Sequence, residues 1–358
     1  MIRILHIIGS LERAGAETFL MNLYRNVDRV RIQFDFAIYS EPTSNSYYEE
    51  VLSLGAKVYK IACKAEGLAK NLKEIKDIVK DNQYTFVWRH VDNCFAGIDL
   101  LAAKCAGAKR LILHAHSSNV NGKIRILHFL SKPCVNMFVT DRFACGKAAG
   151  RWLFGSRKFK ILKNGIDTEH FGFNETIRRE YREKYGIQDE FVIGHVGRFC
   201  EVKNHIFLIN LFCELNKNWD KKTLLVLVGT GEKESEIKDQ VSQYGLDDKA
   251  LFLGSRSDIA ELMQMMDVFI MPSFYEGFPV TLLEAQTSGL PCVVSDVISR
   301  EVDITGNVEF LSLNAGMEIW KDTTRRLSEN KREDKAGMIE KAGYDVRNVA
   351  KWVEGYVL

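Results

Sequence analysis

The sequence predicts an α/β protein with two parallel-sheet domains. Short apolar runs rich in β-branched residues alternate with helical patterns along the chain, which implies parallel strands covered by helices. The alternation forms two series, separated by the polar stretch 174–190. A length of 358 residues suits two domains of ordinary size. We therefore expect two Rossmann-like domains.

The first series predicts seven strands, at 2–8, 32–39, 56–61, 85–90, 110–115, 142–146 and 159–163. Helical patterns such as 17–27 and 148–154 lie between them. The turn-rich segment 164–171 follows the last of these strands and is the expected hinge. The predicted domains therefore cover 1–165 and 166–343.

The second series predicts five strands, at 191–197, 223–229, 251–254, 268–273 and 292–296. One helix is expected to begin near Ser257. Another follows the fourth strand, with Pro279 at its first position and Gly289 just past its end. In open α/β sheets, ligands bind at the carboxyl ends of the strands, so the loops at those ends are the candidate site.

Composition favours a cytoplasmic protein. No apolar run approaches the roughly eighteen residues that a membrane span needs, and residues 1–10 are typical of a first strand rather than of a signal peptide. The eight cysteines include no C-x-x-C pair and fall mostly in apolar segments. This pattern predicts reduced thiols, not a disulfide framework or a zinc site.

Charge is divided unevenly along the chain. Residues 1–163 carry 26 Lys/Arg and 14 Asp/Glu, a net +12, whereas residues 164–358 carry 23 and 33, a net −10. The segment 104–163 holds thirteen Lys/Arg and a single acid, Asp141. A solvated basic surface would explain this, but so would an anionic partner such as a lipid headgroup or a phosphorylated acceptor. We expect no nucleic acid, because no binding motif is present and the whole chain has a net charge of only +2.

Two cations follow the expected strand 191–197. Arg198 and Lys203 suit a diphosphate, since a guanidinium forks onto oxygens and an ammonium acts as a point charge. Each alone is equally consistent with an ordinary loop cation. The strand 223–229 leads through Gly229 into a Gly-x-Gly turn, which lacks the third glycine of a dinucleotide fingerprint.

Two carboxylates flank the helix that starts at Pro279. Glu276 lies on the loop before it and Glu284 near its second turn, where either could accept hydrogen bonds from hydroxyls. The amides of Val280 and Thr281 at the helix start would face an anion. The competing interpretations are a loop acid and a solvated helix carboxylate.

These elements occur in a recognisable order. The E-x7-E pair is Glu276 and Glu284, "GRFCEVKNH" spans 197–205, and "NGID" spans 164–167. Together they resemble the family 4-type glycosyltransferases of GT-B fold, over essentially the whole chain. The stretch that begins "HAHSSN" at His114 is similar to bacterial capsular and exopolysaccharide glycosyltransferases.

The resemblance implies two Rossmann-like domains facing across a cleft, with the final helix 344–358 returning to the first domain. It implies that Arg198 and Lys203 neutralise a departing nucleotide diphosphate and that Glu284 holds the ribose. The remaining matched residues would bind the transferred sugar or lie near the base; they are Glu276, Gly277, Phe278, Pro279, Ser255 and Arg256.

The resemblance also places two elements of the first domain at the substrate. The loop "RAGAE" would face the phosphates through Gly15, although Ala14 stands where the family usually has a glycine. His116 would lie beside the reacting sugar, and His114 is an expected core histidine. An H-x-H pair also suits a metal, but the sequence offers no third ligand nearby.

The chain contains no Asp-x-Asp, the pair with which many glycosyltransferases hold a metal-bound diphosphate. We therefore expect a metal-independent enzyme without a cofactor. The family is retaining, so the leaving phosphate itself can take the proton of the acceptor, and catalysis depends on charge stabilisation and positioning.

The sequence thus predicts transfer of a hexose or N-acetylhexosamine from a nucleotide sugar, UDP-linked, to a saccharide acceptor, lipid-linked, in capsule or exopolysaccharide synthesis. The alternatives are a nucleotide-sugar epimerase of the same fold and a non-catalytic sugar-nucleotide-binding protein. The basic segment and the helical pattern 121–133 predict peripheral attachment to the inner face of an anionic membrane, although core packing would explain the same apolar residues.

Overall fold

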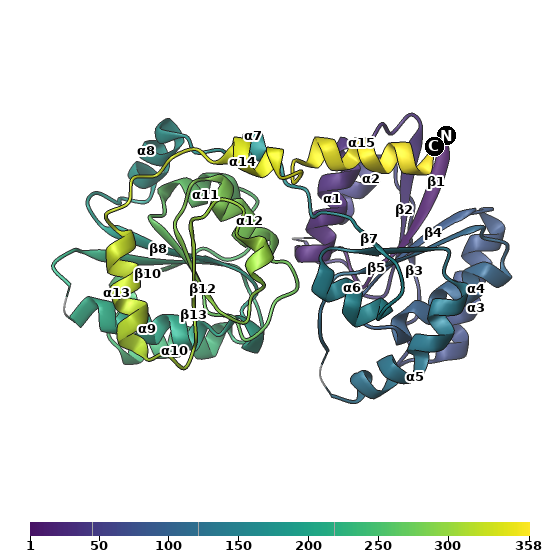
Figure 1. Cartoon of the computed structure of the whole chain (residues 1–358), viewed down its shortest axis with the longest axis horizontal. Coiled ribbons are helices and arrows are strands. Elements are labelled where there is room, and N and C mark those ends of the chain that lie inside the picture. The colour runs from purple at the N-terminus through teal and green to yellow at the C-terminus, as the bar shows by residue number, and fades with distance from the viewer. Residues whose placement is uncertain (45, 121, 218) are drawn as a thin grey trace. The chain divides into compact units, whose positions relative to one another are not determined.

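A computed structural model describes residues 1–44, 46–120, 122–217 and 219–358. The chain forms two compact units. The first contains residues Met1–Gly165 and Val346–Leu358, and the second contains Ile166–Asp345 (Figure 1). Each unit is a parallel sheet with helices on its faces.

The sheet of the first unit has seven strands in the order β3-β2-β1-β4-β5-β6-β7. All of its neighbouring strands are parallel. The bounds are β1 (Ile2–Ile7), β2 (Ile32–Ile38), β3 (Val58–Lys60), β4 (Phe86–Val91), β5 (Arg110–Ala115), β6 (Asp141–Ala144) and β7 (Lys160–Ile161). Each matches a predicted strand within two residues at either end, because each is a short apolar run bounded by turn residues.

Eight helical segments surround this sheet in the described residues: α1 (Gly15–Asn26), α2 (Tyr48–Ser53), α3 (Leu68–Asp81), the 3₁₀ turn η1 (Phe95–Ile98), α4 (Asp99–Cys105), α5 (Lys123–Phe138), α6 (Lys147–Phe154) and α15 (Val346–Val357). The predicted helix range 121–133 begins at residue 121, which lies outside the described residues.

The final helix belongs to the first unit, as predicted. Val349, Val353 and Val357 of α15 are buried in the same core as α1 and β1. The ring of Trp352 lies 5.7 Å from that of Phe143 in β6. Figure 1 shows α15 alongside α1, although more than 300 positions separate them in the sequence.

The second unit repeats this arrangement with six strands in the order β10-β9-β8-β11-β12-β13. The bounds are β8 (Phe191–Val196), β9 (Thr223–Val228), β10 (Ala250–Phe252), β11 (Val268–Met271), β12 (Cys292–Ser295) and β13 (Val308–Leu311). The helical segments are α7 (Thr168–Phe171), α8 (Glu175–Lys184), η2 (Glu201–Lys203), α9 (His205–Lys217), α10 (Glu234–Gln243), η3 (Asp247–Lys249), α11 (Ile259–Met265), α12 (Val280–Thr287), η4 (Arg300–Val302), α13 (Met317–Leu327) and α14 (Ala336–Lys341).

Two predicted helix starts in this unit need correction. Pro279 caps α12 with an extended backbone (φ −70°, ψ 113°) and is not its first helical residue. The helix expected near Ser257 begins two residues later, at Ile259, with Asp258 as its N-cap residue. The Asp258 carboxylate accepts hydrogen bonds from Arg256 and Tyr181 and makes no side-chain cap hydrogen bond. Gly289, at φ +67°, lies just past the end of α12 as predicted.

In each unit the loops that follow the strands emerge at one edge, since all strands of a sheet run in the same direction. The last residues of β8 and β9 are register partners, as are those of β4 and β5. Within the described part of the chain, no helix combines the length and the apolarity that crossing a bilayer requires.

Candidate functional site

An ion pair joins two loops at the carboxyl edge of the second sheet. The Lys203 ammonium lies 2.6 Å from Oε1 of Glu276, and both side chains are largely buried, with 19% and 12% of their surface exposed. Two hydrogen bonds hold the loops together: the Phe274 amide donates to the Val202 carbonyl, and the Asn204 side chain donates to the Pro272 carbonyl. The structure therefore brings together two of the predicted residues that lie 73 positions apart.

Arg198 is placed differently. Its guanidinium pairs with Glu232 at 3.0 Å, and 72% of the side chain is exposed. An exposed ion pair is weak, since water and salt screen it. Arg198 can therefore exchange Glu232 for an anionic ligand at little cost.

The start of α12 offers donors without acceptors. Among the described residues, no group accepts a hydrogen bond from the Val280 or Thr281 amide. Amides of a first helical turn bind anions, and the helix dipole favours negative charge there. Gly277 and Phe278 lead into this turn, and the Phe278 ring stacks on that of Tyr344, with centroids 5.3 Å apart.

Glu284 lies one turn further along α12 and is 6% exposed. Its carboxylate has no hydrogen-bond or ion-pair partner in the described parts of the chain. Burial without a partner disfavours the charged form and raises the pKa of Glu284 to about 7. A buried carboxylate without a partner is a candidate ligand-binding group.

Gly229, at the end of β9, packs against the backbone of the loops that follow β8 and β10. It adopts φ +140°, and a Cβ there would lie 2.0 Å from the Gly197 carbonyl oxygen. Its amide donates to the Gly254 carbonyl at 2.8 Å. The ends of three strands are thus joined by backbone contacts that leave no room for a side chain.

Ser255 and Arg256 follow this junction. The Arg256 guanidinium donates two hydrogen bonds to Asp258, at 2.8 and 2.6 Å. Arg256 is therefore tied within its own loop, and the backbone around Ser255 is the part of this segment left to face a ligand.

In the first unit, Gly15 begins α1 with open space around it. Ala14 caps the helix in an extended conformation, with φ −131°. The loop requires no positive φ at Ala14 or Gly15, so alanine at position 14 causes no backbone strain.

Sequence reasoning overlooked Glu17 in the same loop. Glu17 lies in the first turn of α1, is 9% exposed, and receives a long 3.4 Å hydrogen bond from Ser10. Burial raises its pKa to about 7. An acid two residues after Gly15, at the start of the expected helix 17–27, was the signal available in the sequence.

Histidines from three strands meet at the carboxyl edge of the first sheet. His116 follows β5, and its Nε2 lies 2.9 Å from Nδ1 of His90 in β4. The Nε2 of His90 lies 3.0 Å from Nδ1 of His6 in β1. His114 is fully buried, as expected, with both ring nitrogens unpartnered in the described residues.

The expectation that the H-x-H pair has no third metal ligand nearby is wrong. His90 supplies a third imidazole, and ligand atoms of His90, His114 and His116 lie within 4.8 Å of one another. Sequence spacing hid this residue, because β4 and β5 are neighbours only in the folded sheet.

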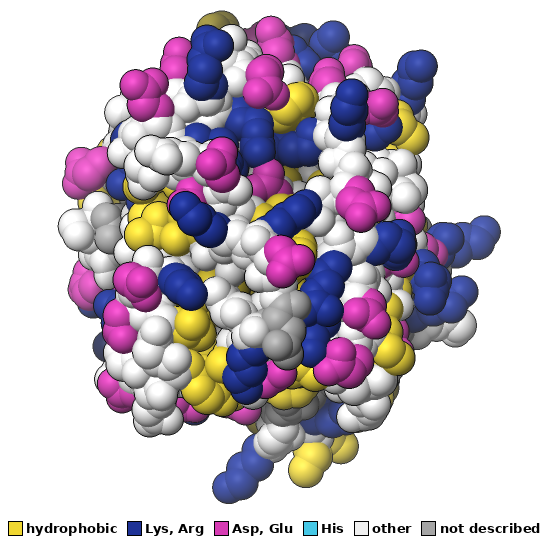
Figure 2. All heavy atoms as spheres, turned by 90° about the vertical axis from the view of Figure 1, so that its left-hand side faces the viewer, with side chains coloured by type: hydrophobic (Ala, Val, Ile, Leu, Met, Phe, Trp, Pro, Cys, Tyr) yellow, Lys and Arg dark blue, Asp and Glu magenta, His cyan; other side chains and the backbone are white. Residues whose placement is uncertain are grey.

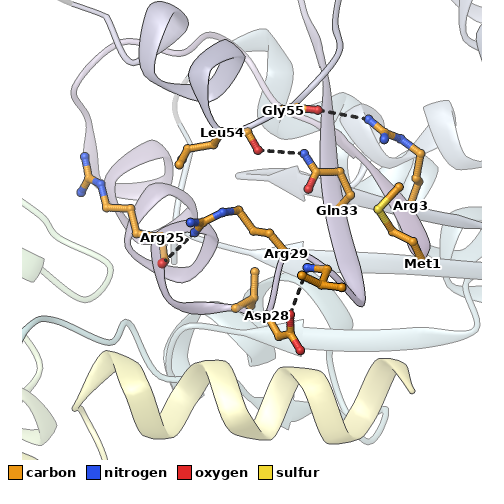
Figure 3. A pocket seen from close by; sticks show the side chains of 10 residues that line it. Met1, Arg3, Arg25, Asp28, Arg29, Gln33, Leu54 and Gly55 are labelled. Carbon is orange, nitrogen blue, oxygen red and sulfur yellow. Dashed lines mark hydrogen bonds between the residues drawn. The ribbon is translucent and has the colours of Figure 1, made fainter.

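A surface hollow lies at the opposite, amino edge of the first sheet (Figure 3). Its three arginines already have partners: Arg3 pairs with Asp35, Arg25 with Glu50, and Arg29 donates to backbone carbonyls. None of the predicted site residues lines it.

The family of the chain follows from comparison with known proteins. The model of the family described as "Glycosyl transferases group 1" matches residues 177–344. EpsF of Bacillus subtilis, named as a glycosyltransferase, is 38% identical over 96% of this chain and 93% of its own length. An Escherichia coli protein named UDP-Gal:α-D-GlcNAc-diphosphoundecaprenol α-1,3-galactosyltransferase is 27% identical over 79% of each chain.

Solved structures agree with this relationship at the level of the fold. Anabaena HepE in complex with UDP and glucose has a TM-score of 0.79 and 18% identity, covering 100% of this chain and 99% of that one. The glycosyltransferase WaaG, involved in lipopolysaccharide biosynthesis, has a TM-score of 0.68 and 14% identity, covering 98% and 95%. With two parallel sheets and a final helix returning to the first unit, the chain belongs to the group 1, family 4-type glycosyltransferases and has the GT-B fold.

Proposed function

We propose that this glycosyltransferase is a retaining, metal-independent enzyme that transfers a hexose or N-acetylhexosamine from a UDP-linked sugar to a lipid-linked saccharide. The observation that carries the proposal is the carboxyl edge of the second sheet. One continuous stretch of that edge holds a cation, two amides and a buried carboxylate, and neither the amides nor the carboxylate has a partner among the residues that the structure describes.

Each group matches one part of a nucleotide sugar. The Val280 and Thr281 amides and the Lys203 ammonium suit the diphosphate, and Arg198 adds a second cation. Glu284 accepts hydrogen bonds from the ribose hydroxyls. When the diphosphate binds, Lys203 pairs with it in place of Glu276. The Glu276 carboxylate then accepts hydrogen bonds from hydroxyls of the sugar.

The transfer step balances without a protein base. The bond between the anomeric carbon and the diphosphate oxygen breaks, and the acceptor oxygen forms a bond to the same carbon on the same face. The acceptor proton passes to the departing diphosphate. The cations and amides stabilise the negative charge that develops on the leaving group, which is the largest contribution expected of such a site.

The names of related proteins support the substrate classes. HepE was solved with UDP-glucose, and the Escherichia coli relative is named for a UDP-galactose donor and an undecaprenol-linked acceptor. A polysaccharide or capsule pathway is therefore the proposed setting.

A panel of nucleotide sugars tests the donor, because a bound ligand raises the thermal midpoint by mass action. We expect a UDP-sugar to raise it and nicotinamide dinucleotides to leave it unchanged. Product analysis then separates transferase from epimerase: a new glycosidic bond supports the proposal, whereas a free epimerised nucleotide sugar contradicts it. Metal independence is tested by excess chelator, which should leave turnover unchanged; activity lost and then restored by magnesium or manganese would overturn it.

We also propose that helix α5 attaches the enzyme to an anionic membrane. Ile126, Leu130 and Met137 recur along one stripe of α5 and are 64%, 73% and 78% exposed. Phe129 is half exposed beside them. Of the apolar residues in the expected pattern 121–133, Leu127, Phe129 and Leu130 are exposed, which disfavours core packing for them, whereas Ile124 is only partly exposed.

Cations border this apolar stripe. Lys123 and Arg125 lie in the first turn of α5, and Arg125 lies over the Trp152 ring at 5.7 Å. An apolar stripe flanked by Lys and Arg is typical of an interfacial helix. Each cation near an anionic surface contributes about 1 kcal/mol of attraction.

Vesicle sedimentation tests this attachment. Binding should increase with the fraction of anionic lipid, decrease with salt, and decrease for Lys123→Glu with Arg125→Glu. The matched control is Lys217→Glu with Lys238→Glu in the second unit, where each lysine pairs with a glutamate of its own helix. Acidic and basic side chains are interspersed on the face drawn in Figure 2, without a purely basic patch. Equal binding to neutral and anionic vesicles would contradict the proposal.

A further inference from the structure

Three imidazoles form a hydrogen-bonded chain that ends at the candidate catalytic residue His116. The distances are 3.0 Å from His6 to His90 and 2.9 Å from His90 to His116. His6 and His90 are fully or almost fully buried, whereas the His116 ring is partly exposed. The remaining nitrogen of His116, Nδ1, has no partner among the described residues.

Each ring of the chain is neutral at physiological pH. Burial lowers the pKa of His6 to about 3 and lowers the pKa values of His90 and His116 below their ordinary range. A neutral imidazole carries one proton, so one nitrogen of each ring donates and the other accepts. The two hydrogen bonds must therefore run in the same direction along the chain.

Only two proton arrangements are possible. In the first, His6 donates to His90, His90 donates to His116, and the proton of His116 is on the outward Nδ1. In the second, every proton is on Nε2, and the outward Nδ1 of His116 is bare. The arrangements differ at the buried end, where Nε2 of His6 has no partner in the described residues.

The buried end favours the first arrangement. Orphaned N–H groups are rarer in protein interiors than unsatisfied acceptors, and the second arrangement would leave the His6 Nε2–H without an acceptor. The indole of Trp88 stacks on the His6 ring, with centroids 5.4 Å apart, and its own N–H has no partner in the described residues. Since an indole only donates, Trp88 offers no acceptor for a second N–H on His6.

We infer that His90 and His6 are positioning residues that hold His116 as the Nδ1–H tautomer. His116 then donates a hydrogen bond to a hydroxyl oxygen of the transferred sugar and is not a general base. The inference rests on the proposed function for the identity of the ligand, but the tautomer itself is a property of the ligand-free chain.

A metal ion competes with this arrangement. A zinc ion bound by His90, His114 and His116 would need bare nitrogens about 2 Å from the metal. The facing nitrogens of His90 and His116 lie 2.9 Å apart, the separation of a hydrogen bond, and one of them carries the shared proton. Zinc would have to displace that proton and break the chain.

The test is long-range ¹H–¹⁵N correlation NMR on the full chain labelled in its eight histidines. This measurement identifies the protonated nitrogen of each ring, and the His116 signals are assigned by their loss in His116→Asn. We expect Nδ1 of His116 to be protonated in the wild type. In His90→Phe, which keeps an aromatic ring against Trp88, we expect His116 to change to the Nε2–H form or to a mixture of both.

Activity provides the second readout. Supporting residues behind a functional imidazole typically change activity by about 10- to 100-fold. We expect His90→Phe to lower kcat within that range with a smaller change in KM, and the exposed His170→Asn to change neither the tautomer nor kcat.

Three results would overturn the inference: Nε2–H on wild-type His116, an unchanged His116 tautomer in folded His90→Phe, or stoichiometric zinc that shifts the signals of all three rings. A correct tautomer in a protein that transfers no sugar would instead contradict the proposed function alone.

Discussion

The two units have the same strand order around their first strands, but their carboxyl edges use different chemistry. The second unit presents an ion pair, free amides and a strand junction without space for side chains. The first presents neutral imidazoles and a glycine loop with open space around it. The comparison shows that a shared topology positions the loops, whereas the side chains on those loops decide whether an edge binds charge or offers directed hydrogen bonds.

The largest expected effect is a loss of turnover when a cation at the carboxyl edge of the second sheet is removed. Lys203→Ala should lower kcat on the order of a hundredfold or more, because it deletes a preorganised cation facing the leaving group. The measurement is steady-state turnover with the donor identified by thermal shift. Lys217→Ala, which removes an exposed lysine paired with Glu214 on the same unit, should stay within about twofold. Equal losses in both variants would show that the edge is not specialised for charge.

The second prediction concerns a feature that the two edges share, a buried glutamate. Burial raises the pKa values of Glu17 and Glu284 from 4.5 to about 7, so the folded state binds more protons than the unfolded state between these values. The protonated carboxyl groups therefore make their full contribution to the stability of the folded state below pH 4.5, and this contribution is lost as pH rises through 7. For each group the loss amounts to at most about 3 kcal/mol.

This effect is measured as the thermal midpoint of the ligand-free protein at pH 5 and pH 8. Glu284→Gln and Glu17→Gln should each reduce the decrease between these pH values by roughly 5 °C relative to wild type. The control Glu214→Gln should not, because a hydrogen bond from Lys217 lowers the pKa of Glu214. A wild-type pH dependence retained in both variants would refute the assignment of these carboxyl groups.

The smallest expected effect is a change in the free energy of unfolding when a glycine at either edge is replaced by alanine. Gly229→Ala should destabilise the protein by about 2 kcal/mol, since the new Cβ would lie 2.0 Å from a carbonyl oxygen. Gly15→Ala should change stability by less than about 1 kcal/mol, because its Cβ meets nothing within 4 Å. Urea denaturation measures both, and a costly Gly15→Ala would mean that the first loop is as constrained as the second.

The sequence was most informative where local pattern and fold coincide. The twelve predicted strands are present because each is a short apolar run, and central strands such as β8 and β9 are buried on both faces of their parallel sheet. β13 (Val308–Leu311) was missed, since it is an edge strand in which only Val308 is buried and Glu309 interrupts the apolar run. Helix α8 was missed because it has no buried residue and its sequence is almost entirely polar.

The candidate site was predictable only in part, for a similar reason. Lys203 and Glu276 belong to motifs with fixed spacing, so each could be found without knowing that they touch. His6 and His90 belong to no motif, and their connection to His116 depends on which strands become neighbours. The available signal was that each lies within or just after an expected strand.

The placement of α15 has a consequence for the order in which the protein is made. Glu354 accepts a hydrogen bond from the Asp28 amide, a contact that spans 326 positions of the chain. The core of the first unit therefore lacks α15 until all of the second unit, which is continuous in sequence between Ile166 and Asp345, has been synthesised. Because contacts between distant segments form late in folding, the half of the protein that is synthesised first is the half that is completed last.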